Sequence, residues 1–311
     1  MCEEAPDSAE AFGARLGLTA FFLVNAQLDR AESLANAMHH HAAGGDSEQP
    51  VEAAAWLGTT LFFRARFDEA LPLLVQASDS RVEGERLGNR RSTGRAGVDP
   101  TILALSHLTW MHLVQGDAAD AQRRRDQMMA SAERLDQAVS LAHAINYASG
   151  YALITGDDAE ALRLAELERG VASAAKLTHY VAYSHVLAGA AIRHANPIEA
   201  SEQLNRGIRL RAEAGARLAV PFHFALLADI ELGAGRLDRA RVAVDSARRL
   251  ALEVGELWWL PEIARLDGQV HLRCGDASGA RRNFTEACSL ARKTGARFLE
   301  SRAQEARTHL S

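Results

Sequence analysis

Stretches of apolar residues with helical spacing recur along the chain at nearly constant intervals, separated by short polar turns. Each unit has an apolar helix, a turn that holds Gly, Ala or Asp, and an alanine five residues later that opens a second helix. Aligned on that alanine, successive units are 39, 51, 40, 39, 40 and 40 residues apart. The anchors are Ala31, Ala70, Ala121, Ala161, Ala200, Ala240 and Ala280. This period predicts stacked helix-turn-helix repeats.

Two further positions of the unit keep a residue type. Twelve residues before the anchor, where the two helices should touch, every side chain is small: Thr19, Gly58, Thr109, Ser149, Ala188, Ala228 and Gly268. Five residues before it, where the first helix should end, stand Ala26, Ala65, Gly116, Gly156, Ala195, Gly235 and Gly275. Glycine is typical of a helix C-terminus. Because alanine is common throughout this chain, these flanking positions support the repeat more strongly than the anchors do.

The unit resembles the tetratricopeptide repeat, which has small residues at its eighth and twentieth positions and a glycine in the turn. The second unit shows the likeness best, in Leu57, Gly58, Phe67, Ala70 and Ala77. A standard repeat has about 34 residues, so the helices or turns are longer here. The resemblance covers nearly the whole chain and implies an all-α solenoid, a superhelix of about seven such repeats with a concave face.

We therefore expect residues 1–311 to form a single repeat domain. Apolar and charged residues are interspersed at about 297–310, as expected of a helix that caps the last repeat. The long 51-residue interval places an insert loop at residues 78–100, which is rich in arginine. That insert is either a solvated loop or a lid near the mouth of the superhelix.

Composition predicts a core filled mainly by small side chains, since the 311 residues include 60 alanines and only 6% aromatic residues. A net charge of -5 and only two lysines, Lys176 and Lys293, disfavour nucleic acid and membranes as partners. No segment is apolar over the roughly 18 residues needed to span a bilayer. Cys2, Cys274 and Cys288 form no C-x-x-C pair, which indicates a reducing, cytoplasmic setting.

Residues 255–266 (GELWWLPEIARL), 287–292 and 295–303 carry a narrower likeness, and residues 57–63 and 98–100 fit it too. These segments resemble the C-terminal repeat region of bacterial signalling ATPases, a family that includes transcriptional regulators linked to adenylyl cyclase. The sequence has no G-x-x-x-x-G-K-[ST] phosphate loop and no cyclase sequence. The resemblance therefore implies a regulatory module and carries over neither ATPase nor cyclase activity.

No pattern in the sequence is typical of catalysis or metal binding, so we expect no catalytic residue, metal or cofactor. Residues 39–41 are three consecutive histidines, which point about 100° apart on a helix and cannot converge on one ion. The motifs G-x-S-x-G and H-E-x-x-H are both absent. For an enzyme, the best candidates would be His112, His179 and Cys274.

The first helix of each repeat lines the concave face in this architecture, so its inward positions are candidate binding residues. The fifth, ninth and twelfth positions of the third to seventh repeats face inward, and they include Trp110, Asn146, His185, Asp229, Arg265 and Gln269. Such a groove suits a protein or peptide partner, with polar groups setting the register. A receptor for a small molecule or a signalling peptide is the alternative. Co-chaperones of this family clamp a peptide carboxylate with lysine and asparagine, and the matching positions here have no lysine, which disfavours chaperone tails.

Trp258 and Trp259 stand out in a chain with few aromatic residues. We expect them to join neighbouring repeats at the boundary between the sixth and seventh. One of them could instead face a partner, because successive residues on a helix cannot both be buried on the same face.

Overall fold

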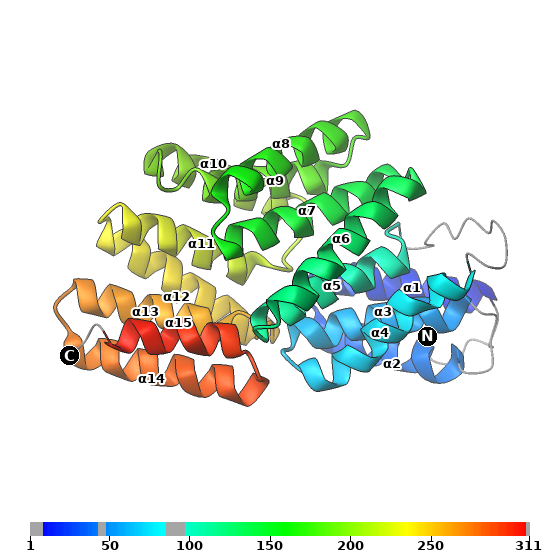
Figure 1. Cartoon of the computed structure of the whole chain (residues 1–311), viewed down its shortest axis with the longest axis horizontal. Coiled ribbons are helices and arrows are strands. Elements are labelled where there is room, and N and C mark those ends of the chain that lie inside the picture. Colours follow the sequence, from blue (N-terminus) through cyan, green and yellow to red (C-terminus); the bar gives the residue numbers. More distant parts are fainter. Residues whose placement is uncertain (1–8, 43–47, 85–96, 309–311) are drawn as a thin grey trace.

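The computed structural model describes residues 9–42, 48–84 and 97–308, and these ranges hold fifteen helices and no strand. The helices form seven pairs and a final single helix (Figure 1). The first helices of the pairs are α1 (Ala9–Val24), α3 (Glu48–Phe63), α5 (Pro100–Val114), α7 (Ala138–Thr155), α9 (Thr178–Ala191), α11 (Val220–Gly233) and α13 (Leu260–Arg273). The second helices are α2 (Leu28–Ala42), α4 (Phe67–Gly84), α6 (Ala118–Leu135), α8 (Asp158–Ala174), α10 (Pro197–Glu213), α12 (Leu237–Val254) and α14 (Ala277–Thr294), and α15 (Arg297–Thr308) follows. The predicted all-α solenoid of seven repeats with a final helix is confirmed.

The turn inside each repeat follows the small residue that the sequence places five positions before the anchor. That residue has a positive φ in six of the seven repeats: Ala26, Ala65, Gly116, Gly156, Gly235 and Gly275. A left-handed residue ends a helix and redirects the chain while its neighbours bond to the last free carbonyls. The fifth repeat differs, because there the chain passes through Ala195 to Asn196, whose side chain caps α10 instead.

The small residues twelve positions before the anchor lie where the two helices of a repeat touch. A Cβ atom added to Gly58 would stand 2.8 Å from the side chain of Leu74, and one added to Gly268 would stand 2.5 Å from Phe284. Real Cβ atoms do not come so close to a neighbour. The repeat therefore needs small residues at this position to bring its helices together, and large residues such as Phe284 fill the space beyond.

The first helices form the inner layer of the solenoid and the second helices the outer layer. Consecutive first helices pack closely along one another, for example α3 with α5 and α5 with α7. Consecutive second helices lie farther apart in the described part of the chain and meet through long side chains, as Arg248 of α12 meets Glu286 of α14. Burial agrees, since α5 is buried along almost its whole length and α6 on one side only. The layer that should line a concave groove is thus itself enclosed.

The solenoid closes on itself after five repeats. The carbonyl oxygen of Val24, at the end of α1, accepts a hydrogen bond of 3.0 Å from the backbone N–H of Leu218, just before α11. The carbonyl oxygen of Phe63, at the end of α3, accepts one of 2.8 Å from Leu257, just before α13. A third contact joins the turn after α5 to the start of α15. The ends of α1, α3 and α5 therefore meet the starts of α11, α13 and α15.

Aromatic and histidine side chains fill the space that this closure encloses. Their neighbouring ring centroids lie between 4.7 and 6.5 Å apart. We call this group the central aromatic cluster: Phe62, Phe63, His107, Trp110, His143, Tyr147, Tyr180, Tyr183, Phe222, His223, Trp258 and Trp259. The open concave groove expected from the sequence is, at this level of the molecule, a packed core.

The arginine-rich insert expected at residues 78–100 differs from the structure at both ends. Helix α4 continues to Gly84, so the loop does not begin at Ser78. At the other end, the Asp99 side chain accepts hydrogen bonds from the backbone N–H groups of Thr101 and Ile102 and so caps α5. Residues 85–96 lie outside the described part of the chain.

Candidate functional site

Trp110, the first predicted binding residue, belongs to the central aromatic cluster. Its Nε1 donates a hydrogen bond of 3.0 Å to the carbonyl oxygen of Tyr147. Its ring centroid lies 5.6 Å from that of Phe222 and 5.0 Å from that of Trp258. Only 6% of Trp110 is exposed. The residue therefore joins the third repeat to the sixth and seventh and does not face an open groove.

Asn146 and His185, both at the fifth position of a repeat, face the second helix of their own repeat. The Asn146 amide donates to Glu168 Oε1 on α8 at 3.1 Å, and both side chains are buried. Burial raises the pKa of the Glu168 carboxyl well above its ordinary value. His185 Nδ1 lies 3.3 Å from Gln203 Oε1 on α10. These polar groups are matched within their repeats, contrary to the expectation that they line a groove.

Arg265 is also buried and already paired. Its guanidinium donates two hydrogen bonds to the Glu262 carboxylate, of 2.9 and 2.7 Å. Arg302 on α15 reaches the same carboxylate at 3.0 Å. The nearby guanidinium groups hold the pKa of Glu262 below its ordinary value although burial alone would raise it. Glu262 thus ties α13 to the final helix through Arg302, while Arg265 pairs within α13 and is not exposed in a groove as expected.

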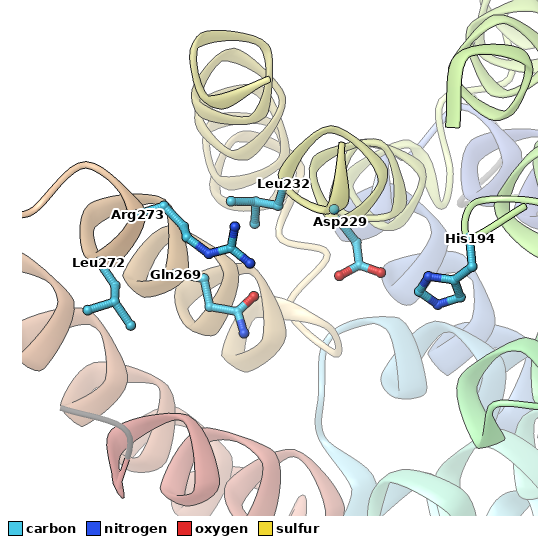
Figure 2. Close-up of a pocket in the computed structure, with 7 residues that line it drawn as sticks. His194, Asp229, Leu232, Gln269, Leu272 and Arg273 are labelled. Carbon is cyan, nitrogen blue, oxygen red and sulfur yellow. The ribbon is translucent and has the colours of Figure 1, made fainter. Parts of the chain in front are cut away.

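The remaining two predicted residues, Asp229 and Gln269, line a pocket of about 190 Å³. It lies at the C-terminal ends of three successive first helices, α9, α11 and α13 (Figure 2). The full lining is His194, Asp229, Leu232, Gly233, Gln269, Leu272 and Arg273. We call it the repeat-end pocket. A second cavity of about 220 Å³, between α10 and α12, has an almost wholly apolar lining that includes Ile208 and Leu250.

The repeat itself explains why the pocket opens at this place. Residues 193, 233 and 273 are equivalent in three consecutive repeats and are Arg193, Gly233 and Arg273. A Cβ atom added to Gly233 would have no neighbouring atom within 4 Å. The pocket is therefore the space that a side chain as long as arginine would occupy at position 233.

Charged groups of both signs face the repeat-end pocket. The closest cation to the Asp229 carboxylate is Arg193 Nε at 3.7 Å, while Arg193 Nη1 lies 2.7 Å from Asp158. His194 Nε2 is 3.9 Å from Asp158 and its side chain is 74% exposed. Among the described residues, Arg273 and Gln269 have no hydrogen-bond or ion-pair partner for their side chains. The pocket thus presents one weakly paired carboxylate, one unpaired guanidinium and one unpaired amide.

Two of these residues, His194 and Arg273, lie outside the positions predicted from the sequence. The prediction covers the fifth, ninth and twelfth positions of a repeat, and Arg273 occupies the thirteenth. A usable signal exists, because Arg273 follows Gln269 by one helical turn and shares its face of α13. The glycine at the equivalent position 233 is the second signal, since it leaves room in front of that face.

The three candidate catalytic residues lie on or beside three different helices. His112 lies at the end of α5, His179 packs against Tyr180 and Tyr183 near the start of α9, and Cys274 follows α13. None of them lines the repeat-end pocket. In the described ranges, no three His, Cys, Asp or Glu side chains are placed to hold a metal ion. None of the helices described is at once long and apolar enough to cross a membrane.

No protein-family model and no curated protein matches the chain. Among solved structures, the apo form of RapI is similar at 10% identity and a TM-score of 0.50, covering 84% of this chain and 97% of that one. Aspartyl phosphate phosphatase F from Bacillus subtilis is similar at 11% identity and a TM-score of 0.51, covering 98% and 94%. A tetratricopeptide repeat protein from Parabacteroides merdae matches at 14% identity and 0.47, covering 95% and 100%. At such identities the likeness is one of fold, that of tetratricopeptide-like helical repeats.

Proposed function

We propose that this chain is a non-enzymatic regulatory module that binds part of a protein or peptide partner in the repeat-end pocket. The supporting observation is that Arg273 and Gln269 line a cavity and that neither side chain has a partner among the described residues. Three other predicted binding residues, Asn146, His185 and Arg265, are matched by Glu168, Gln203 and Glu262. Unmatched donors in a concave site are available to a ligand.

The size of the pocket supports a partner larger than the pocket itself. Sites that enclose a whole small molecule or cofactor usually measure about 300–1,000 Å³. A cavity of about 190 Å³ accommodates one or two side chains, or a chain end, of a longer ligand. This favours a protein or peptide over the alternative of a free small molecule.

The finer relation to the repeat regions of bacterial signalling ATPases is also a proposal, and it rests on the sequence likeness around residues 255–266. A cytoplasmic setting is also proposed, because Cys274 and Cys288 are both free thiols. The fold likeness to RapI and to aspartyl phosphate phosphatase F is compatible with a regulatory role. The partner itself is inferred from the pocket.

Filling the pocket tests the proposal. Gly233→Trp places a large ring where a Cβ meets no atom, so the fold should survive while the pocket is blocked. Gly170→Trp is the matched control, because Gly170 is an exposed position of α8 that is equally open. Immobilised wild-type and control proteins should retain the same partner from an extract of the native host, quantified by mass spectrometry, and Gly233→Trp should lose it. Equal retention by all three proteins would show that the pocket is not the binding site.

The small-molecule alternative has its own test. A ligand that binds only the native state raises the melting temperature. If a metabolite library stabilises the wild type but not Gly233→Trp, and no protein partner depends on the pocket, the receptor function replaces the scaffold function.

A further inference from the structure

We propose that the repeat-end pocket recognises a charge pair, namely a carboxylate and a cationic group carried on the same or neighbouring residues of the partner. The inference rests on the proposed function and names the chemistry of what is bound. Figure 2 shows the two halves of the site, with Gln269 and Arg273 on one side of the pocket and Asp229 and His194 on the other.

The part of the site that would bind the ligand's carboxylate is on α13. Arg273 and Gln269 lie one turn apart there, and neither side chain has a partner among the described residues. A guanidinium presents planar, paired donors that match a carboxylate, and the Gln269 amide can add a further N–H donor. Arg273 is exposed, so it carries no burial cost that an internal partner would have to offset.

The part of the site that would bind the ligand's cationic group is on α11. The Asp229 side chain is 41% exposed, and its nearest cation stands at 3.7 Å, well beyond the ~2.7–2.9 Å of a charge-assisted hydrogen bond. That cation, Arg193, is engaged elsewhere, by Asp158 at 2.7 Å and the Ala190 carbonyl oxygen at 2.9 Å. A ligand cation can therefore approach Asp229 without displacing a strong ion pair.

The backbone reinforces this division. Helices α9 and α11 end at Ala191 and Gly233, so their C-terminal ends lie beside the pocket. The C-terminal end of a helix carries partial negative charge and favours cations. Helix α13 also ends there, but Arg273 occupies its last position and reverses the local sign. Leu232 and Leu272 also line the pocket and give it apolar surface for the aliphatic part of a basic side chain.

Two kinds of peptide can supply this chemistry within about 190 Å³. One is an internal segment with adjacent acidic and basic residues, and the other is a basic residue at a free carboxyl terminus. Fluorescein-labelled peptides distinguish them: an internal Lys-Glu pair with blocked ends, and a C-terminal lysine as the free acid or as the amide. In matched peptides, glutamine replaces the acid and norleucine replaces the lysine.

Fluorescence polarisation of these peptides with the purified chain tests the inference. We expect at least one charge-pair peptide to bind wild type and the surface control Arg281→Gln equally, and neutralising either charge to weaken binding about tenfold. Arg273→Gln should abolish the preference for the acid and keep the preference for the base. Asp229→Asn should do the reverse. Circular dichroism melts check that both variants are folded.

The outcomes separate this inference from the proposed function. If neutral peptides bind as tightly as charged ones and Gly233→Trp still blocks them, the charge-pair inference fails while the binding function stands. If no charge-pair peptide binds wild type at millimolar concentration, the inference fails as well. If charge-pair peptides bind but Gly233→Trp leaves their affinity unchanged, the pocket is the wrong site and both proposals fall.

Discussion

Asp117 and Arg297 form a salt bridge of 2.8 Å although they are 180 positions apart in the chain. Asp117 stands in the turn after α5 and Arg297 opens α15, so the pair links the third repeat to the final helix. Both side chains are well exposed, at 45% and 66%. Exposed ion pairs contribute little to stability because water screens them. The pair therefore marks the closure of the solenoid, and the free energy of closure comes from elsewhere.

Replacing Arg297 should confirm that the ion pair is dispensable. Arg297→Ala is expected to lower the free energy of unfolding by less than about 1 kcal/mol. Urea unfolding followed by far-UV circular dichroism measures this change. A larger loss would mean that the closure depends on the surface pair and that the central aromatic cluster contributes less than its burial suggests.

Trp258 should carry far more of the closure. It is 1% exposed, and its ring contacts those of Phe62, Trp110 and Phe222, which come from three different repeats. Trp258→Ala removes these contacts and leaves a cavity, so we expect a loss of about 3–5 kcal/mol in the same urea experiment. Trp258→Phe keeps part of the packing and should lose clearly less. Equal effects of Trp258→Ala and Arg297→Ala would contradict this account.

Acid should destabilise the protein through His107. Its Nδ1 donates to the Leu103 carbonyl oxygen at 2.8 Å, so Nε2 accepts from the Tyr147 hydroxyl at 2.8 Å. Burial lowers the pKa of His107 from 6.5 to about 4. The unfolded chain then binds more protons below pH 6.5, so stability is fully present above that pH and is lost as the pH falls toward 4. Burial also lowers the pKa of the facing His143 and raises the pKa of Tyr147, so the neighbours stay neutral in this window.

His107→Gln removes this proton uptake while keeping polar groups near Tyr147. Between pH 7 and pH 5 the variant should lose roughly 2 kcal/mol less stability than the wild type. Urea unfolding at the two pH values supplies the comparison. The pH dependence is the informative quantity, because the variant starts from a lower stability for packing reasons alone. Parallel curves for the two proteins would exclude His107 as a source of acid sensitivity.

Glu256 should stabilise the folded protein as the pH falls, which is opposite to the effect of His107. Burial raises its pKa from 4.5 to about 7, although hydrogen bonds from the Ala219 N–H and Trp258 Nε1 and the charge of Arg211 partly oppose the shift. A raised pKa in the folded state gives stability that is present below pH 4.5 and is lost as the pH rises through 7. In Glu256→Gln the loss between pH 7 and pH 5 should therefore be steeper than in the wild type, by roughly 2 kcal/mol. An unchanged or shallower loss would show that Glu256 is ionised in the folded protein throughout this range.

The elements of this fold were predictable because their signals are local. The left-handed turn at Gly156 needs only a residue that tolerates positive φ, and the contact at Gly58 needs only a small one. The direction in which the fifth position faces was not predictable in this way, since it depends on how the second helix leans against the first. Asn146 meets Glu168, twenty-two residues later on that helix.

Closure of the solenoid was not predictable from the repeats. It depends on the small rotation of each repeat relative to the next, added up over five repeats. Trp258 and Trp259 show the consequence. Successive residues of a helix cannot share a buried face, yet α13 begins only at Leu260. Both rings lie in the preceding turn and both are buried in the central aromatic cluster. The candidate site accordingly lies at the open ends of the first helices, at Asp229 and Gln269, and not at their middle.

The contact between α9 and α10 should depend on Gly189 more than on any interaction of a side chain there. A Cβ at this position would stand 2.7 Å from the Ala200 carbonyl oxygen and 2.8 Å from the Leu204 nitrogen. These are backbone atoms of α10, so a methyl group can fit only if the helices move apart. We expect Gly189→Ala to cost roughly 1–3 kcal/mol, as overpacked cores do.

The same substitution at Gly170 separates overpacking from helix propensity. Gly170 lies in α8, and a Cβ added there would meet no atom within 4 Å, so alanine should gain up to about 1 kcal/mol from better helix propensity. Thermal melts of the two variants should therefore shift in opposite directions from the wild type. Stabilisation by both would mean that α9 and α10 can separate at little cost, and that the small residues of this repeat reflect the alanine-rich composition instead of close packing.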